Sequence, residues 1–550
     1  MKTNDPAPEP AGLGGGAPGD PDMPGSRQLR TILVAVCVAL MAVIASVSGL
    51  NVAQPDLAVD FGASQTTVLW FINVYTLTLA ALLLPLGAVG DRVGRKPMLV
   101  VGLVVFGVAS AAAGLAPSSE IMLAARMLSG VGAAVIMPIT LAVITSTFPD
   151  DKRGQAIGIW TGVAGGGGIL GMFLSAVLVD VASWRWLFAL PVALIVVALV
   201  MTLRSVPNSR ERHDAGFDTI GALTSVVAVS SFIIVLQEGP ERGWSDAVTV
   251  AGLVVGLVST SAFVVWELRR GAAALLDVRL FGTRGLSAGS VVLLVVFGVQ
   301  AGVFVVLFLF LQSVVGWSAL LSTLAMMPMA VLMMVASALA PRLSSRFGAR
   351  VSMGAGILLF AAGLAAMAGT VSVDGGYPSI LPGMLAMGVG MGLAMTPSTE
   401  SITSSLPRER QGVASALNDV TRELGTALGV ALLGGLLTAG YRDAVEDTME
   451  SVPPRLADAA LQGIAPAVEA AGDAGEQHVL ELAQQAFVQG WQSAMWAGVA
   501  VMGALFLYVV LRGPRHGTGP GPDTTDDAVV RPSQPATRSA LGAESAASGG

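Results

Sequence analysis

The chain has 550 residues, of which 53% are hydrophobic and only 12% are charged, and its formal net charge is −7. Soluble globular proteins carry about 25% charged residues, so this composition excludes an ordinary water-soluble enzyme and a disordered hub. With 30 basic against 37 acidic residues, the chain has no basic excess with which to hold nucleic acid. One cysteine and three histidines leave nothing for an internal disulfide or a metal centre, so we expect no cofactor and no metal site.

Long uncharged runs predict helices that cross a membrane. A bilayer core needs about 20 apolar residues per helix, and lipid favours helices because they satisfy their own backbone hydrogen bonds. The run at 285–341 is too long for one helix, so we expect a break at Val314–Ser318 and two helices there. A further span at 412–437 is apolar apart from three charged residues. The fourteen predicted spans therefore lie at 31–55, 61–90, 97–119, 127–149, 154–179, 186–203, 219–237, 247–266, 285–341 (two spans), 351–373, 375–399, 412–437 and 482–511.

The distribution of Lys and Arg predicts the orientation. With the N-terminus in the cytoplasm, the inner segments hold 24 of the 30 basic residues and the outer segments hold four. The positive-inside rule then places both termini in the cytoplasm of a multi-pass protein in a bacterial inner membrane. We expect Pro/Gly-rich disordered tails at 1–30 and 513–550. The acidic outer loop at 438–481 is predicted to form a short exposed helical hairpin, with helical periodicity around Leu456–Leu461 and Val479–Ala486.

An internal repeat predicts two like-oriented halves. Residues 123–171 and 381–429 align without gaps at an offset of 258, with 14 identities in 49 positions. Both copies cross the bilayer in the same sense, which is typical of transporters whose halves are related by an axis along the membrane normal. The glycines that the two copies share are expected where helices of the two halves approach closely.

The loop after the second span carries a specific motif. Residues 87–97 read Gly-Ala-Val-Gly-Asp-Arg-Val-Gly-Arg-Lys-Pro, and the second copy at 341–350 has Ser345 in place of Asp91. This motif resembles the signature loop of the major facilitator superfamily. Fourteen spans with an extra pair in the middle resemble its drug:proton antiporter branch. Further similar stretches lie at 125–134, 183–188, 217–221 and 413–418, and the resemblance covers nearly all of 31–512.

The resemblance implies an all-α membrane protein with two pseudo-symmetric six-helix bundles and two extra central helices. It places the N-terminal bundle at 31–203, a linker with the extra helices at 204–285 and the C-terminal bundle at 286–512. It also implies a monomer that moves small molecules by alternating access. In the gating loop, Asp91 would cap and charge-pair with neighbouring helices; the alternative is a basic loop that happens to hold one carboxylate. The gating residues carried over are Gly87, Asp91, Arg92, Gly94 and Arg95.

Charged residues near the end of the chain are candidates for proton coupling. Asp419, Arg422 and Glu423 stand three and four positions apart, which places them on one face of a helix that begins near Gly412. Glu400 on the preceding helix is expected at a similar depth. One arginine neutralises one carboxylate at a time, so we expect these carboxylates to titrate as a coupled set, as proton coupling requires. The alternative is a structural ion pair near the cytoplasmic end.

Arg126 is the other charged residue expected inside a span. It lies a turn or two from the outer end of the fourth helix, where a guanidinium group is costly unless it faces the bundle or water. The resemblance implies a part in proton coupling. The alternative is that Arg126 reaches outward to the interface or bonds a helix carbonyl. Its counterpart in the repeat is Met384.

Some positions depart from the family pattern. An acidic residue usual on the first helix is replaced by Ser46, and another on the second helix by Asn73. The motif that usually ends Gly-Pro-x-x-Gly-Gly reads Gly-Met-Phe-Leu-Ser-Ala at 171–176, although a run of four glycines precedes it at 165–168. These departures count against a strongly cationic substrate. Polar candidates for the substrate pathway, each of which could instead be a satisfied buried residue, are Ser46, Asn51, Asn73, Tyr75, Gln300, Gln312 and Asn418.

Three functions remain open at this level. The first is a secondary active exporter that exchanges drug-like or amphiphilic molecules for protons across the lipid bilayer. The second is a uniporter or symporter for one specific metabolite on the same fold. The third is an intramembrane enzyme or receptor, but the spans hold no catalytic dyad or metal cluster in the sequence. The chain has no nucleotide-binding motif, which leaves an electrochemical gradient as the power source.

Overall fold

Fourteen helices are long and apolar enough to cross a bilayer, as the sequence predicts. The computed structural model describes residues 25–209, 216–448 and 452–514. The most apolar stretch of each of these helices has a mean hydropathy between 1.5 and 2.8. The predicted tails lie almost entirely outside the described residues. The first helix nevertheless begins at Ser26, so the last residues of the tail predicted at 1–30 are helical.

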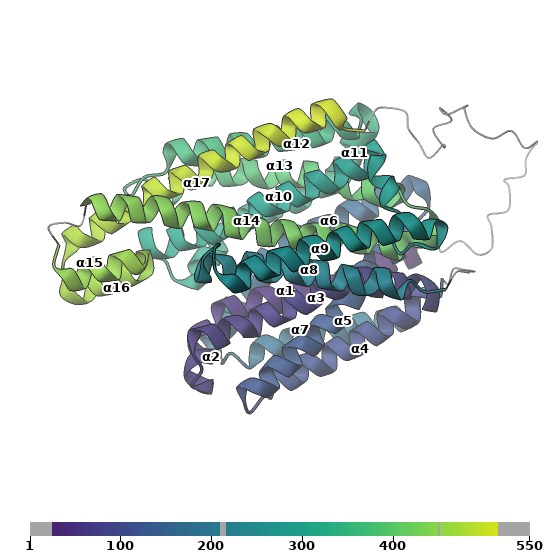
Figure 1. Ribbon diagram of the computed structural model, residues 1–550, viewed down its shortest axis with the longest axis horizontal. Helices are drawn as coiled ribbons and strands as arrows, with labels where there is room; N and C mark the ends of the chain where they lie inside the picture. Colours follow the sequence, from purple (N-terminus) through teal and green to yellow (C-terminus); the bar gives the residue numbers. More distant parts are fainter. Residues whose placement is uncertain (1–24, 210–215, 449–451, 515–550) are drawn as a thin grey trace, which may run out of the picture. The chain divides into compact units, whose positions relative to one another are not determined.

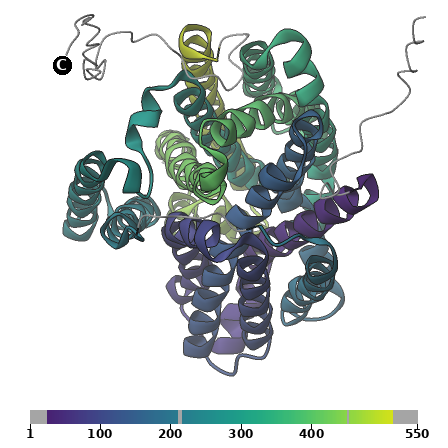
Figure 2. The same ribbon diagram turned by 90° about the vertical axis from the view of Figure 1, so that its right-hand side faces the viewer.

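The membrane helices form two bundles of six with an extra pair beside them, which confirms the expected fold class. Figure 2 shows the N-terminal bundle in purple and blue and the C-terminal bundle in green and yellow. The N-terminal bundle contains α1 (Ser26–Val52), α3 (Gln65–Val93), α4 (Arg95–Gly114), α5 (Ser119–Thr147), α6 (Asp150–Val181) and α7 (Trp186–Ser205). The C-terminal bundle contains α10 (Arg284–Leu309), α11 (Ala319–Phe347), α12 (Ala349–Thr370), α13 (Gly376–Ser404), α14 (Gln411–Thr448) and α17 (Gln477–Arg512).

The extra pair consists of α8 (Thr219–Arg242) and α9 (Ala247–Arg270). Helix α8 packs against α3 of one bundle and α14 of the other, and α9 packs against α8. The shorter elements are α2 (Gln54–Phe61), η1 (Gly271–Ala273), η2 (Val278–Gly282), η3 (Phe310–Val314), η4 (Arg408–Arg410), α15 (Pro454–Gln462) and α16 (Ile464–Ala474). We call the end of the bundles where α1 starts and α17 finishes the termini end, and the opposite end, which carries α15 and α16, the hairpin end (Figure 1).

The long apolar run at 285–341 is divided where the sequence predicts. Helix α10 passes into a π-helical turn at Phe310–Val314, and α11 begins at Ala319. Gly316 between them has a φ of 77°, a left-handed conformation that only glycine adopts readily. Ser318 then caps α11, because its side chain accepts a hydrogen bond of 3.3 Å from the Leu321 backbone N–H.

The helical hairpin differs in detail from the prediction. Helix α14 continues to Thr448, well beyond the predicted span, and the hairpin is made of α15 and α16 alone. Val479–Ala486 is the first part of α17 rather than a second arm of the hairpin. Sequence periodicity marks a helix but cannot show which neighbouring helix it continues. Leu456 in α15 and Ile464 in α16 are buried and belong to the same hydrophobic core as the bundle helices, and α16 packs against α17.

The repeated glycines occupy matching helix crossings in the two bundles. Gly132 lies against α4 and its counterpart Gly390 against α12, while Gly171 lies against α1 and its counterpart Gly429 against α10. A hypothetical Cβ on Gly171 would stand 2.9 Å from the Cα of Ala45. These crossings lie inside one bundle, whereas the sequence placed the shared glycines between bundles. Small residues let helix backbones approach closely in lipid, and each bundle needs that approach within itself.

One repeated pair does lie between the bundles. Gly154 at the start of α6 faces Pro341 of α11, and Gly412 at the start of α14 faces Gly87 of α3. Gly154 and Gly412, which correspond in the repeat, therefore both lie at contacts between the bundles at the termini end.

We predict that Gly429→Ala destabilises the C-terminal bundle. A Cβ at this position would overlap the carbonyl group of Gly298 in α10, and backbone cannot yield as a flexible side chain does. Gly434→Ala is the matched control in the same helix, because nothing lies within 4 Å of its Cβ position. Thermal unfolding of the purified proteins should show a lower Tm for Gly429→Ala and an unchanged or higher Tm for Gly434→Ala, since alanine favours helix by about 1 kcal/mol. Equal Tm values would contradict the assigned crossing.

Candidate functional site

The carboxylate of Asp91 joins the two bundles at the termini end. The backbone N–H of Gly412 lies 2.8 and 2.9 Å from the two oxygens of Asp91, and the N–H of Val413 donates to Oδ2 at 3.2 Å. These donors are the free N–H groups of the first turn of α14, where the helix dipole also favours a negative charge. Asp91 stands in the last turn of α3, so it caps a helix of the opposite bundle.

Arg95 completes this contact. Its Nη2 lies 3.3 Å from Asp91 Oδ1 and donates to the carbonyl of Arg408 at 3.0 Å. Both side chains are almost fully buried. Gly94 adopts a φ of 115°, which allows the sharp turn from α3 into α4. A Cβ on Gly87 would lie 2.6 Å from the Gly412 carbonyl oxygen, so only glycine permits this approach of α3 and α14.

Arg92 points elsewhere, toward the segment that leads into the extra helices. Its Nη2 donates to the carbonyl of Gly216 at 3.1 Å, and its guanidinium group lies 5.5 Å from the centre of the Phe217 ring. The backbone N–H of Arg95 donates to the carbonyl of Ser209 at 3.1 Å. The predicted gating residues are therefore brought together, and the linker before α8 is bound to them.

The charged residues of α14 form a buried ion pair near the middle of the protein. Arg422 Nη1 lies 3.5 Å from Asp419 Oδ1, and Asn418 donates to the same oxygen at 3.2 Å. Asp419 is completely buried, and its Oδ2 has no hydrogen-bond partner within the described ranges. A buried carboxylate with one unsatisfied oxygen is costly.

Arg422 also reaches across the interface between the bundles. Its Nη2 donates to the carbonyl of Ala164 in α6 at 3.4 Å. Its guanidinium group lies 4.3 Å from the centre of the Phe297 ring in α10 and 5.6 Å from that of Trp160 in α6. The charge is therefore held between an aromatic ring from each bundle, so a change in its pairing acts directly on the contact between them.

Arg126 lies inside the N-terminal bundle rather than at the interface with lipid headgroups. Its Nε donates to the carbonyl of Phe71 and its Nη1 to the hydroxyl of Ser46, both at 2.9 Å. It is completely buried, and its charge lies 4.3 Å from the centre of the Tyr75 ring. Ser46 thus occupies the place of a carboxylate partner without supplying a negative charge.

Glu423 is the other carboxylate of this part of α14. It is partly buried and interacts electrostatically with Arg422 beside it and with Tyr75 of the opposite bundle. Tyr75 also interacts with Arg126. The structure therefore gathers two arginines and two carboxylates around the middle of the interface, with Arg126 from one bundle and Asp419, Arg422 and Glu423 from the other.

Glu400 lies apart from this group. Its Oε1 is 3.4 Å from the Cβ position of Gly154, and its electrostatic partner is Arg153 in the first turn of α6. The sequence placed Glu400 with Asp419 because their depths match. Depth along two helices does not fix their rotation, and α13 turns this residue toward α6 at the termini end.

The predicted pathway residues divide in the same way. Ser46, Tyr75 and Asn418 belong to the charged group described above, and the Tyr75 hydroxyl donates to the Val43 carbonyl at 3.3 Å. Gln300 is buried, and its Oε1 has no partner in the described part of the chain. Asn73 and Gln312 are partly buried. The side chain of Asn51 lies outside the described residues.

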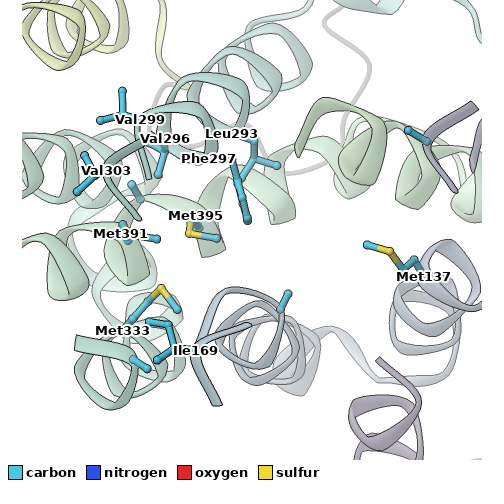
Figure 3. Packing of buried hydrophobic residues seen from close by; sticks show 14 of the residues in the cluster. Met137, Ile169, Leu293, Val296, Phe297, Val299, Val303, Met333, Met391 and Met395 are labelled. Carbon is cyan, nitrogen blue, oxygen red and sulfur yellow. The ribbon is translucent and has the colours of Figure 1, made fainter. Parts of the chain in front are cut away.

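Buried apolar side chains pack close to these charges. Met333 of α11 contacts the Cβ position of Gly165 in α6, and Met395 of α13 lies 3.4 Å from it. Figure 3 shows Phe297 close to Met395, and Met333 beside Ile169. The four-glycine run of α6 sits where this helix passes between α11 and α1. Flexible methionine side chains accommodate varied apolar shapes.

The sequence reasoning missed Trp160 and the carbonyl of Ala164. Both lie on α6, four positions apart. The repeat offset of 258 makes Ala164 the counterpart of Arg422. That correspondence could have indicated the contact. The buried acids Asp218 and Glu267, at the termini end of α8 and α9, were also missed, because a carboxylate near a helix end is usually solvated.

The fold and the buried charges define a membrane transporter built from two similar bundles. The Major Facilitator Superfamily model matches residues 36–430, and the chain belongs to that family. It is 29% identical to the multidrug resistance protein Stp of Mycobacterium tuberculosis over 87% of this chain and 91% of that protein. It is 32% identical to the multidrug efflux pump LfrA of Mycolicibacterium smegmatis over 86% and 94%. Among solved structures, it is similar to the human organic anion transporter MFSD10, with a TM-score of 0.57, 14% identity and coverage of 87% and 100%.

We predict that Asp91→Ala opens the termini end of the interface. The substitution leaves Arg95 buried without its carboxylate, and breaking a buried pair costs about 3–5 kcal/mol, which corresponds to a shift of at least about a hundredfold in the open population. A Val413→Cys reporter in a Cys37→Ser background measures this opening, because Val413 is only 4% exposed. Labelling by a membrane-impermeant maleimide from the termini side should rise accordingly. Ser345→Ala changes the residue that corresponds to Asp91 in the repeat and should leave the labelling rate unchanged. We call the contact of Asp91 with the start of α14 the latch. Equal labelling rates with and without Asp91→Ala would refute its role in closing this end.

Proposed function

We propose that this protein exports drug-like or amphiphilic small molecules and exchanges them for protons by alternating access. The observation that carries this proposal is the buried Asp419–Arg422 pair, whose arginine also bonds the Ala164 carbonyl of the other bundle. A group that can bind a proton is thereby linked, through one guanidinium, to the surface along which the bundles must move.

Protonation of Asp419 would remove the counter-charge of Arg422. An unpaired buried guanidinium is strongly unfavourable, so Arg422 would turn to Glu423 or withdraw from the Ala164 carbonyl. Either change weakens the contact between α14 and α6. Deprotonation restores the pair and the contact. The proton thus selects between two arrangements of the interface, as antiport requires.

The opposite bundle supplies the second arginine of this exchange. Arg126 has hydrogen bonds to Phe71 and Ser46 but no carboxylate of its own bundle within bonding distance among the described residues. Glu423 of the other bundle and Arg126 both interact electrostatically with Tyr75. With two arginines and two carboxylates the group is balanced, and uptake of one proton makes it positive. Release of a positively charged or polarised substrate is then favoured by repulsion.

The end at which the two bundles are joined indicates the step of the transport cycle that the structure represents. Hydrogen bonds of Asp91 and Arg95 join the bundles at the termini end. The excess of Lys and Arg in segments at that end supports a cytoplasmic location for it and for both termini. In this orientation the protein is closed to the cytoplasm, as expected after substrate has been carried outward. We propose that a single chain performs the cycle.

A uniporter or symporter for one metabolite is the less favoured function. The relatives named above are efflux and resistance proteins.

We predict that Asp419→Asn and Glu423→Gln each abolish export. Both changes keep the side-chain size but remove the titratable group. In a drug-hypersensitive host, resistance to a panel of amphiphilic antibiotics should fall to the level of the empty vector. Glu409→Gln is the matched control, because this carboxylate is exposed at the start of α14, and it should export like the wild type. If the two buried variants also confer full resistance, the assignment of the coupling residues is wrong.

The energy source is tested separately in the same host. Efflux of a fluorescent amphiphile by the wild type should stop when a protonophore collapses the proton gradient. Efflux that continues under these conditions would contradict antiport, whichever residues carry the proton.

We predict that Arg126→Lys impairs transport more than Ser46→Ala does. Lysine keeps the charge but cannot bond the Phe71 carbonyl and Ser46 together while its charge lies over the Tyr75 ring. Ser46→Ala removes one of these bonds and leaves the arginine stacked. Initial rates of dye efflux at matched expression measure the difference. Equal rates for Arg126→Lys and the wild type would show that only the charge matters.

A further inference from the structure

A second pair of buried acids lies where α8 begins and α9 ends. Asp218 is 3% exposed and Glu267 is 1% exposed. Asp218 Oδ1 accepts hydrogen bonds from the Gly221 N–H at 2.9 Å and from Trp266 Nε1 at 2.8 Å. Glu267 Oε2 accepts one from the Leu276 N–H at 3.3 Å. This pair is remote in sequence from the charges of α14 and plays no part in the exchange proposed above.

Each of the two carboxyl groups has one unsatisfied oxygen. Asp218 Oδ2 and Glu267 Oε1 are buried and have no hydrogen-bond partner in the part of the chain that the structure describes. Both border the same small space: a Cβ on Gly221 would stand 3.0 Å from Asp218 Oδ2 and would collide with Glu267 Oε1. The two oxygens therefore border the same position, which the glycine at 221 keeps open.

Among the described residues, two cations lie near these acids. Arg270 Nε lies 4.0 Å from Asp218 Oδ2, and its side chain is 38% exposed. Arg410 interacts electrostatically with Glu267. The charged residues of the elements packed around Glu267 are Asp218, Arg269, Arg270, Asp277, Arg279 and Arg410. Arg279 is occupied, since its Nη2 donates to the Leu268 carbonyl at 3.1 Å. Two buried like charges at close range are relieved most simply by one proton.

The same residues are connected to the latch between the bundles. Gly216 and Phe217, directly before Asp218, hold Arg92 of the gating loop. On the other side, Arg410 stands two positions before Gly412, whose N–H binds Asp91. Helix α8 itself packs on both α3 and α14. A movement of the start of α8 would therefore affect both α3, which carries Asp91, and α14, which begins near Gly412.

We propose that Asp218 and Glu267 form a second proton-binding site, in which one shared proton keeps the α8–α9 pair seated against the gating loop. The proton resides on Glu267 Oε1 and is donated to Asp218 Oδ2. When it leaves, the two carboxylates repel, the start of α8 moves away from Arg92, and the latch opens more readily. The extra helices then act as a pH-sensitive strap across the two bundles. This inference is independent of the antiport mechanism, because the strap responds without substrate.

The test uses the full chain in inside-out membrane vesicles and the Val413→Cys reporter in the Cys37→Ser background. Maleimide labelling is measured from pH 6 to pH 9 without substrate and divided by the rate of a Ser345→Cys protein, an exposed site at the same end that corrects for thiol chemistry. The corrected rate of the otherwise wild-type protein should rise with pH by about fivefold or more, a typical coupling between sites. A flat corrected rate would overturn the proposal.

Two substitutions assign the pH dependence to this pair. Glu267→Gln imitates the protonated acid permanently: its oxygen can accept from Leu276 and its amide can donate to Asp218. It should give a low labelling rate at every pH. Asp218→Asn removes the repulsion from the other side, keeps an acceptor for Gly221 and Trp266, and should flatten the profile even if Glu267→Gln fails to reach the membrane. Glu238→Gln, at the opposite end of α8, is the matched control and should retain the wild-type profile. A wild-type profile in Glu267→Gln and Asp218→Asn would refute the site.

Discussion

The carboxylate of Asp91 at the start of α14 is the contact on which the arrangement of the two bundles depends. A helix N-terminus presents several N–H groups that its own turns cannot satisfy, and at the termini end those of α14 meet an acid from the other bundle. Neither partner can be buried alone at low cost. Because each satisfies the other only when the bundles are closed at this end, one ion–dipole contact distinguishes the closed state from every open one.

The two bundles share a scaffold but divide the chemistry. Matching glycines set matching helix crossings, as at Gly171 and Gly429, so backbone packing follows the repeat closely. The charges do not follow it: Asp419, Arg422 and Glu423 stand opposite Thr161, Ala164 and Gly165 of the first copy. This asymmetry has a physical use. A guanidinium group on α14 can bond a bare carbonyl on α6 because the counterpart position carries only a methyl group. At this crossing the charged residues of α14 therefore face uncharged, closely packed residues of α6.

The extra helices are more than an insertion between two halves. The linker before α8 holds Arg92 and the backbone of Arg95, and α8 bridges α3 and α14. Sequence reasoning identified the extra spans but assigned them no contact with the gating loop. Their influence on the latch comes from a few polar residues at the termini end, where three elements distant in sequence converge. The methionine side chains near Gly165 similarly come from α11 and α13, which are distant from α6 in sequence.

The sequence by itself determined the number of membrane helices, the break before α11, the repeat and the residues able to carry charge, because each depends on local composition or on the low polarity of lipid. It could not determine which way those charges turn. Glu400 and Asp419 were expected at similar depths, yet Glu400 lies beside Arg153 at the termini end, and Arg126 replaces a missing acid with Ser46 and an aromatic ring. Rotation about a helix axis is set by side-chain packing against neighbours far away in sequence. The tertiary structure alone decided which charges meet.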